Sequence, residues 1–177
     1  MAEGQLIVVT GVMAAGKSTV AQALAERLPR SAHVRGDAFR RFVVAGREDI
    51  GAEPSEEAFR QLRLRYRLAI QAAEGYAAAG FTTVLQDVVI GPMLEEFVHM
   101  VAVRPFSLVV LAPDVAEVTR REAARSKTGY GAITPLDLDA VLRQDTARIG
   151  LWVDSTDLTV DRTVDRILAD LEHARID

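Results

Sequence analysis

Gln5-Leu-Ile-Val-Val-Thr10 runs directly into Gly11-Val-Met-Ala-Ala-Gly-Lys-Ser18, and this stretch decides the fold. Residues 5–10 form a dense apolar run that stops at a glycine, which predicts a buried β-strand. Residues 17–28 carry apolar side chains at helical spacing, and Pro29 ends that helix. The Gly-x-x-x-x-Gly-Lys-Ser pattern between a strand and a helix predicts a loop that binds phosphate groups.

The residue types of this loop suit the triphosphate of ATP. Glycines let the backbone turn tightly, so that consecutive N–H groups point at the phosphates at the positive end of a helix. Lys17 is expected to reach the β- and γ-phosphates, and the Ser18 hydroxyl to ligate Mg²⁺. Lysine is rare in this chain, since Lys17 and Lys127 are its only two, which strengthens the prediction. The predicted ATP-binding residues of the segment are Gly11, Val12, Met13, Ala14, Ala15, Gly16, Lys17, Ser18 and Thr19.

Length and composition limit the other possibilities. The 177 residues suit one domain spanning the whole chain, and 49% hydrophobic content is too high for a disordered protein. The absence of cysteine excludes thiol catalysis, Cys-ligated zinc and iron–sulfur clusters. A net charge of −4 argues against nucleic acid as a partner. Residues 1–5 lack the basic start of a secretion signal and residues 6–16 are too short to span a bilayer, so we expect a soluble, cytoplasmic protein without a membrane partner.

Beyond the loop, short β-like runs alternate with helical ones, the pattern of a parallel sheet wrapped by helices. Ser55 is expected to cap a long helix, and Thr134-Pro-Leu-Asp137 to open a shorter one. The prediction is a three-layer α/β/α sandwich with a five-stranded parallel sheet. Its strands are residues 5–10, 33–35, 82–89, 106–112 and 150–154, and its helices are 17–28, 56–79, 93–103, 115–125 and 160–171, with two more beginning at Asp37 and Thr134.

The class of phosphate-loop protein follows from what accompanies the loop. GTPases need an Asn-Lys-x-Asp motif to read the base, and this chain has no asparagine. Motor-type ATPases usually end a strand in Asp-Glu, whereas Asp87 is followed by valine in Val84-Leu-Gln-Asp-Val-Val89. Asp87 is therefore a candidate to support Mg²⁺ through water, without a hydrolytic base beside it. The alternative is a strand-end aspartate that caps the next turn.

A kinase must bring an acceptor hydroxyl to the γ-phosphate, and the run Arg35-Gly-Asp37-Ala-Phe-Arg-Arg41 suits that role. Asp37 stands at the carboxyl end of the second strand, the edge of an α/β sheet where ligands bind. It could accept the proton of the attacking hydroxyl, while Arg40 or Arg41 holds the acceptor or the transferring phosphoryl group. The alternative is that Asp37 caps the following helix. Asp37, Arg40, Arg41 and Asp87 are the predicted substrate residues.

A second arginine-bearing segment, Arg120-Arg121-Glu-Ala-Ala-Arg125, leads into a Gly-rich stretch. A lid at about residues 125–133 would cover the phosphates, exclude water and neutralise charge that develops during transfer. Arg125 thus joins Lys17 and Asp37 as a predicted catalytic residue. The alternative is a solvated helix end, and a solvated face is also expected for Arg60, Arg63 and Arg67.

The sequence resembles the chloramphenicol phosphotransferase group of P-loop kinases, within the shikimate-kinase-like and zeta-toxin-like assembly. The resemblance spans most of the chain and implies a nucleoside- or shikimate-kinase-like P-loop NTPase fold. It also implies Asp37 as general base, Arg125 in the lid, and Arg121 around the adenine together with the loop 154–158, which adds Asp154, Ser155 and Thr156 to the ATP-binding set. The matching pieces are residues 11–18, Asp37, Gln86-Asp87, Arg121-Glu-Ala-Ala-Arg125 and Val153-Asp-Ser-Thr-Asp-Leu158.

The predicted activity is transfer of the γ-phosphoryl of ATP, with Mg²⁺ as cofactor, to a hydroxyl of a small molecule such as an antibiotic, sugar or metabolite. Arg40 and Arg41 depart from the chloramphenicol enzyme, which is less basic after its aspartate, and they favour a polar or anionic acceptor. Two alternatives stay open. One is a nucleotide or sugar-nucleotide kinase of the zeta-toxin kind, and the other is a non-enzymatic ATP-binding regulator.

Overall fold

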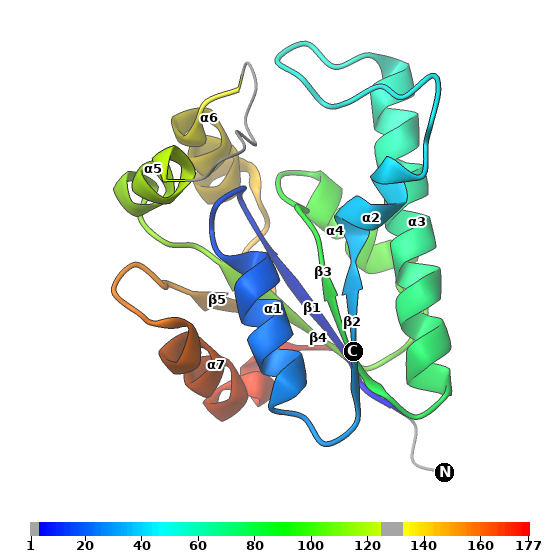
Figure 1. Cartoon of the computed structure of the whole chain (residues 1–177), viewed down its shortest axis with the longest axis vertical. Coiled ribbons are helices and arrows are strands. Elements are labelled where there is room, and N and C mark those ends of the chain that lie inside the picture. Colours follow the sequence, from blue (N-terminus) through cyan, green and yellow to red (C-terminus); the bar gives the residue numbers. More distant parts are fainter. Residues whose placement is uncertain (1–3, 125–132) are drawn as a thin grey trace.

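The computed structural model describes residues 4–124 and 133–177. Within these ranges one six-stranded sheet has the order β2-β3-β1-β4-β5, and β6 pairs with β4 (Figure 1). The first five strands are parallel, as predicted, and β6 is a short antiparallel addition that the sequence analysis missed. The strands are β1 Leu6–Gly11, β2 Ser31–Arg35, β3 Thr82–Gln86, β4 Phe106–Leu111, β5 Leu151–Val153 and β6 Arg175–Ile176.

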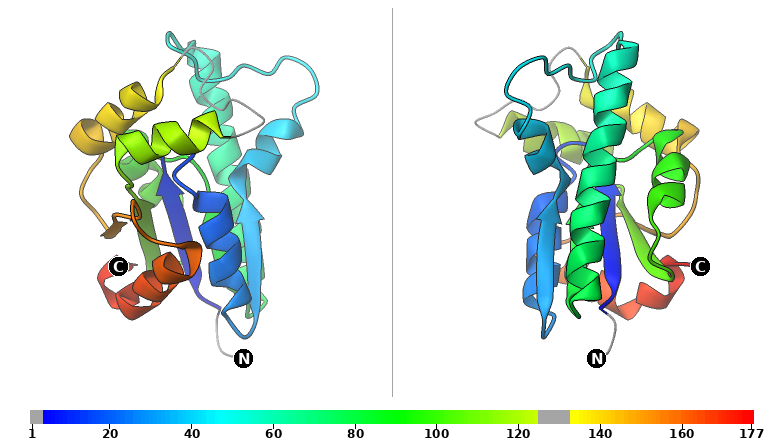
Figure 2. Two further views of the ribbon diagram at one scale, coloured as in Figure 1. Left: turned by 60° about the vertical axis from the view of Figure 1, so that its left-hand side comes forward. Right: turned by 90° about the vertical axis from the view of Figure 1, so that its right-hand side faces the viewer.

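Helices cover both faces of the sheet, which gives the predicted three layers (Figure 2). α1 and α7 lie on one face, and α3 and α4 on the other. None of the helices in the described ranges is long and apolar enough to cross a membrane. The helices are α1 Lys17–Glu26, α2 Gly36–Arg41, α3 Glu56–Ala78, α4 Met93–Met100, α5 Val115–Ala123, α6 Pro135–Ala140 and α7 Val160–Ala169, with a π-helix at Val141–Asp145 and a 3₁₀-helix at Leu171–Ala174.

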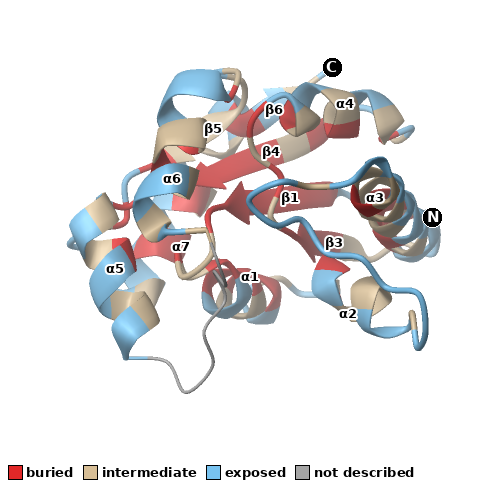
Figure 3. Cartoon of the chain, turned by 90° about the horizontal axis from the view of Figure 1, so that it is seen from above, coloured by how far each residue is buried: buried red, intermediate tan, exposed pale blue. Residues whose placement is uncertain are grey.

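The central strand β1 explains the continuous apolar run of residues 5–10. Ile7 and Val9 belong to the core between the sheet and α1, whereas Leu6 and Val8 belong to the core beneath α3. Because a parallel strand is covered on both faces, its side chains are apolar without alternation. Seen from the carboxyl ends of the strands, the buried residues follow the sheet and the inner sides of the helices (Figure 3).

Local hydrogen bonds set the ends of several elements. The Ser55 hydroxyl accepts from the Ala58 amide at 3.0 Å and starts α3, as predicted. Thr134 and Asp137 form the predicted capping box of α6. β3 ends at Gln86, earlier than the predicted residue 89, because side chains take the next amides: Val88 donates to Asp87 Oδ1 and Val89 donates to Thr10 Oγ1.

The carboxyl ends of the parallel strands meet at one edge of the sheet, at the top of Figure 1. The segment that follows β1 is the predicted phosphate loop, and α2 with Asp37 follows β2. Asp87 follows β3, and α5 with Arg121 comes after β4. Since ligands of open α/β sheets bind at this edge, the topology gathers the predicted site residues where a site is expected.

Candidate active site

The loop between β1 and α1 has the backbone of a tight phosphate-binding turn. Gly11 has φ 143°, Ala14 φ 62° and Gly16 φ 94°, all in the left-handed half of backbone space. A Cβ on Gly11 would lie 2.4 Å from the Leu111 carbonyl oxygen, so the close pairing of β1 with β4 requires glycine here. The Ala15 amide donates to the Val12 carbonyl at 3.2 Å and closes the turn. The loop therefore leads directly into the N-terminus of α1, where the positive end of the helix dipole favours binding of anions.

Lys17 and Ser18 open α1 and face different surroundings. Lys17 is only 7% exposed, and its Nζ donates to the Val12 carbonyl at 2.7 Å, so the ammonium lies against the loop. Ser18 and Thr19 are exposed on the first turn. Ser18 and Thr19 also line a groove of about 480 Å³ whose other wall includes Arg35, at the end of β2. Gln22, Ala23 and Glu26 complete the lining, so the groove runs along α1 and joins its first turn to the end of β2.

Arg121 connects three segments on the other side of the loop. Its Nε donates to Glu117 Oε1 at 2.6 Å, within α5. Its Nη1 donates to the Ala15 carbonyl of the phosphate loop at 3.3 Å, and its Nη2 to the Ser155 carbonyl after β5 at 3.1 Å. The structure therefore brings together Arg121, the phosphate loop and the 154–158 loop, which the resemblance places around the adenine.

Glu117 holds Arg121 in this position. Its side chain is 13% exposed, and hydrogen bonds from Arg120 and Arg121 lower its pKa to about 2. The carboxylate is therefore ionised at any pH near neutrality and orients the guanidinium through a charge-assisted hydrogen bond. Sequence analysis did not single out Glu117, although its position four residues before Arg121 is the spacing at which helical side chains pair.

The turn after β5 is ordered by its own side chains. Asp154 Oδ1 accepts from the Thr156 amide at 3.0 Å and from the Thr156 hydroxyl at 2.6 Å, and these bonds lower the pKa of Asp154. Thr156 Oγ1 in turn accepts from the Asp114 amide at 2.7 Å, which joins the turn to the start of α5. Ser155 is buried, and its Oγ has no hydrogen-bond partner within the described part of the chain.

On the acceptor side, Asp37 lies in the first turn of α2 and its side chain is 51% exposed. No side-chain hydrogen bond caps α2, so the capping alternative for Asp37 has no support in the contacts of this helix. Arg41 donates to Asp37 at 3.0 Å within the helix, and Arg40 forms a two-bond pair with Asp49. Both predicted substrate arginines therefore form ion pairs with aspartates of this chain.

Asp87 is the most buried carboxylate of the predicted set, with its side chain 1% exposed. Its Oδ2 accepts from Arg65 Nε at 2.8 Å, and the second nitrogen of the guanidinium pairs with Oδ1. Oδ1 also accepts from the Val88 amide at 2.7 Å, which matches the strand-end capping alternative. Both oxygens therefore already have protein donors, and an Mg²⁺ role for Asp87 stays a prediction.

Arg65 was not among the predicted site residues, although its position in α3 carries a signal. The residue falls between Leu62 and Ala69 at spacings of three and four, within the apolar stripe of α3. An arginine in a buried stripe needs a carboxylate partner, and only the fold identifies that partner as Asp87. Arg60 and Arg63 pair instead with Glu57 and Glu96 near the surface, in keeping with the expected solvated face.

Arg125 and most of the predicted lid, residues 125–132, lie outside the described residues.

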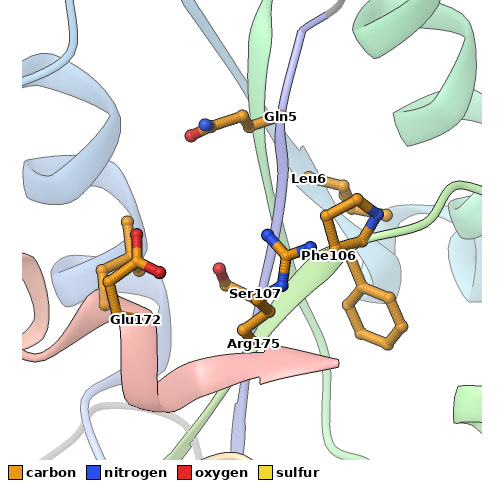
Figure 4. A pocket seen from close by; sticks show the side chains of 8 residues that line it. Gln5, Leu6, Phe106, Ser107, Glu172 and Arg175 are labelled. Carbon is orange, nitrogen blue, oxygen red and sulfur yellow. The ribbon is translucent and has the colours of Figure 1, made fainter. Parts of the chain in front are cut away.

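A separate cavity of about 80 Å³ lies at the opposite, amino-terminal edge of the sheet, lined by Gln5, Phe106, Glu172 and Arg175 among others (Figure 4). Its distance from the loop, across the length of the strands, separates it from the candidate site.

Comparison with known families and structures agrees with this fold. The chain matches the AAA_33 family, described as an AAA domain, over residues 6–148. A comparison with curated proteins finds no match.

Solved structures similar to this chain include three proteins with about the same span. A sugar kinase from Janibacter sp. HTCC2649 has a TM-score of 0.70 at 16% identity, covering 97% of this chain and 96% of its own. A tunicamycin resistance protein from Deinococcus radiodurans has a TM-score of 0.69 at 17% identity, covering 98% and 99%. The APS kinase of Mycobacterium tuberculosis, solved with AMPPNP and APS, has a TM-score of 0.68 at 17% identity, covering 97% and 99%. At these identities the likeness shows a shared fold.

Proposed function

The chain belongs to the AAA domain family, and we propose that it is an ATP-dependent phosphotransferase that phosphorylates a hydroxyl of a small molecule. The observation that carries the proposal is the shared sheet edge: the phosphate loop with Lys17 follows β1, and the exposed carboxylate of Asp37 follows β2 at the same edge, with β3 between the two strands. A groove lined by Ser18, Thr19 and Arg35 connects the start of α1 with the end of β2. A nucleotide-binding regulator needs the loop but not an exposed carboxylate at the same edge.

The similar structures support a phosphotransferase rather than a regulator, because two of them are kinases. One of these, the APS kinase, was solved in complex with AMPPNP and APS. In that protein, therefore, the fold accommodates AMPPNP and a second small molecule at once. The tunicamycin resistance protein shows the fold in a protein connected with an antibiotic.

The proposed reaction assigns a role to each group. The loop amides and Lys17 bind the β- and γ-phosphates, and Arg121 with the 154–156 turn holds the adenosine end. The acceptor oxygen attacks the γ-phosphorus, the bond between phosphorus and the ADP oxygen breaks, and Asp37 accepts the proton of the attacking hydroxyl. Arg125, from the predicted lid, would stabilise the charge on the transferring group.

The residues present fit a magnesium ion that arrives with ATP. The exposed Ser18 hydroxyl is suited to ligate it, and Asp87 could contact it only through water, because Arg65 and Val88 occupy its oxygens. In the described ranges no three acidic or histidine side chains cluster as a metal site. Such a sparse donor set suits Mg²⁺, which usually takes few protein ligands besides phosphates and water. When bound, the ion would neutralise phosphate charge.

Testing the proposal requires an ATP-consumption screen over hydroxylated antibiotics, sugars, nucleosides and acidic metabolites. Lys17→Ala should abolish turnover while the chain stays folded, and Asp37→Asn should lower the rate about 10²-fold or more with ATP affinity retained. Asp165→Asn is the matched control, because Asp165 is also a half-exposed carboxylate paired with an arginine, on α7. ATP binding without turnover against any acceptor would favour the regulator instead.

A further inference from the structure

Asp87 lies where three elements come together at the end of the sheet. Arg35 and Gln86 are register partners in β2 and β3, so the next residues of each strand, Gly36 and Asp87, lie side by side. A Cβ on Gly36 would lie 1.9 Å from Asp87 Oδ2, which shows how closely the carboxylate approaches the backbone where α2 begins. The same Oδ2 accepts from Arg65 of α3. The carboxylate thus joins the start of α2, the end of β3 and the middle of α3.

From this geometry we propose that Arg65 and Asp87 form a clamp that positions α2 and, through it, the carboxylate of Asp37. The proposal rests on the proposed function and deepens it: Arg65 and Asp87 are positioning residues for the phosphoryl transfer. Neither needs to touch the acceptor, because the clamp acts through the backbone of Gly36, the residue directly before Asp37.

α2 needs such an external anchor. It has six residues and no side-chain hydrogen bond at its N-terminus, so it has little stability of its own. The ion pair of Asp37 with Arg41 lies within the helix and cannot fix the helix to the sheet. Arg40 pairs with Asp49 of the exposed segment after α2, so this pair does not join the helix to the sheet, and Phe39 packs against the core beneath α3. A hydrophobic contact of this kind sets no direction, whereas a two-bond pair of guanidinium and carboxylate fixes an orientation.

The surroundings of Arg65 agree with this placement. Its side chain is 16% exposed, and burial lowers its pKa, although a guanidinium stays charged at any pH near neutrality. Asp37, Arg40 and Asp49 are close enough to contribute to its electrostatic environment. The clamp therefore lies directly behind the acceptor side of the site.

Amide hydrogen exchange on the full chain tests the clamp without any acceptor. In Arg65→Met, the amides of residues 37–42 should exchange at least about 10-fold faster, while those of α1 and the affinity for Mg·ATP stay unchanged. Arg63→Met is the control, because Arg63 lies one half-turn away on the same helix and pairs with Glu96. Arg65→Lys, which keeps the charge but not the paired geometry, should restore part of the protection.

Unchanged exchange in α2, or equal acceleration throughout the chain, would overturn the clamp as a positioning device. If Arg65→Met does not fold, Gly36→Ala is the second variant, since its Cβ displaces the Asp87 carboxylate. With an acceptor from the screen, Arg65→Met should lower kcat at least about 10-fold with the KM for ATP unchanged. An equal fold-change in kcat and in the KM for ATP would contradict the proposal. Because exchange does not depend on turnover, wild-type-like ATP binding and turnover by Lys17→Ala would refute the proposed function and leave the clamp result intact.

Discussion

At the scale of single residues, the phosphate loop depends on backbone conformations that few side chains tolerate. Gly11 combines φ 143° with a close approach to the Leu111 carbonyl oxygen, so both strain and contact exclude a Cβ. Ala14 adopts φ 62° despite its Cβ, an outlier of the type that clusters at binding sites. Gly75, in α3, has open space around it and needs no such freedom.

These two glycines predict opposite effects of the same substitution. Gly11→Ala should lower the free energy of unfolding by about 1–3 kcal/mol, because the added methyl meets a backbone oxygen and φ is unfavourable. Gly75→Ala should raise it by about 0.5–1 kcal/mol, since alanine loses less conformational entropy in a helix. Urea denaturation of both variants measures the difference. Destabilisation of equal size at both positions would show that the loop geometry is not responsible.

At the scale of elements, α5 is tied to the phosphate loop and to the turn after β5 by one side chain. Arg121 donates to carbonyls of both segments, whereas Arg120 lies 71% exposed and donates to Glu117 within the helix. The two neighbouring arginines thus offer a comparison in which charge, helix and acidic partner are held constant. The connection to the other segments differs, and with it the exposure, which is 71% for Arg120 and 25% for Arg121.

Arg121→Ala should therefore weaken binding of Mg·ATP about 10-fold, through loss of a hydrogen-bonded charge that orders two loops, with little effect for Arg120→Ala. Isothermal titration calorimetry measures the affinity of both variants.

Glu117, with a pKa lowered from 4.5 to about 2, contributes stability that is complete above its ordinary pKa and is lost as pH falls toward 2. The contribution of this carboxylate to ATP affinity should accordingly be constant between pH 5 and 8. For the two arginines, an affinity loss with Arg120→Ala as large as with Arg121→Ala would contradict the assignment of the ATP-binding role to Arg121.

At the scale of the whole molecule, the sequence predicted the layers and the parallel strands because apolar periodicity and end signals are local. Ser55 and Thr134 start helices where predicted, and the phosphate loop is a contiguous motif. The pairing of Arg65 with Asp87 and of Arg40 with Asp49 depends on chain folding, so no local pattern reveals it. β6 was not predicted for the same reason, because its two residues form a strand only by pairing with β4.

The last prediction concerns the stability of the whole chain when nucleotide binds. A ligand that binds only the folded state stabilises it by about 2.7 kcal/mol at a concentration 100 times its Kd. For a chain of this size, each kcal/mol raises Tm by about 2–4 °C, so saturating Mg·ATP should raise Tm by roughly 5–10 °C. Differential scanning calorimetry measures the shift, and Lys17→Ala should abolish most of it, because the loop loses its buried ammonium.

Arg65→Met serves here as the internal comparison, since the clamp lies on the acceptor side of the sheet edge. Its Tm without ligand should fall, because Asp87 is left buried without its cation. The increment that Mg·ATP adds should nevertheless equal that of the wild type, since the phosphate loop and Arg121 are untouched. Loss of the ATP increment in Arg65→Met would mean that nucleotide and acceptor sides are energetically coupled through Asp87, which would assign that carboxylate to the nucleotide site after all.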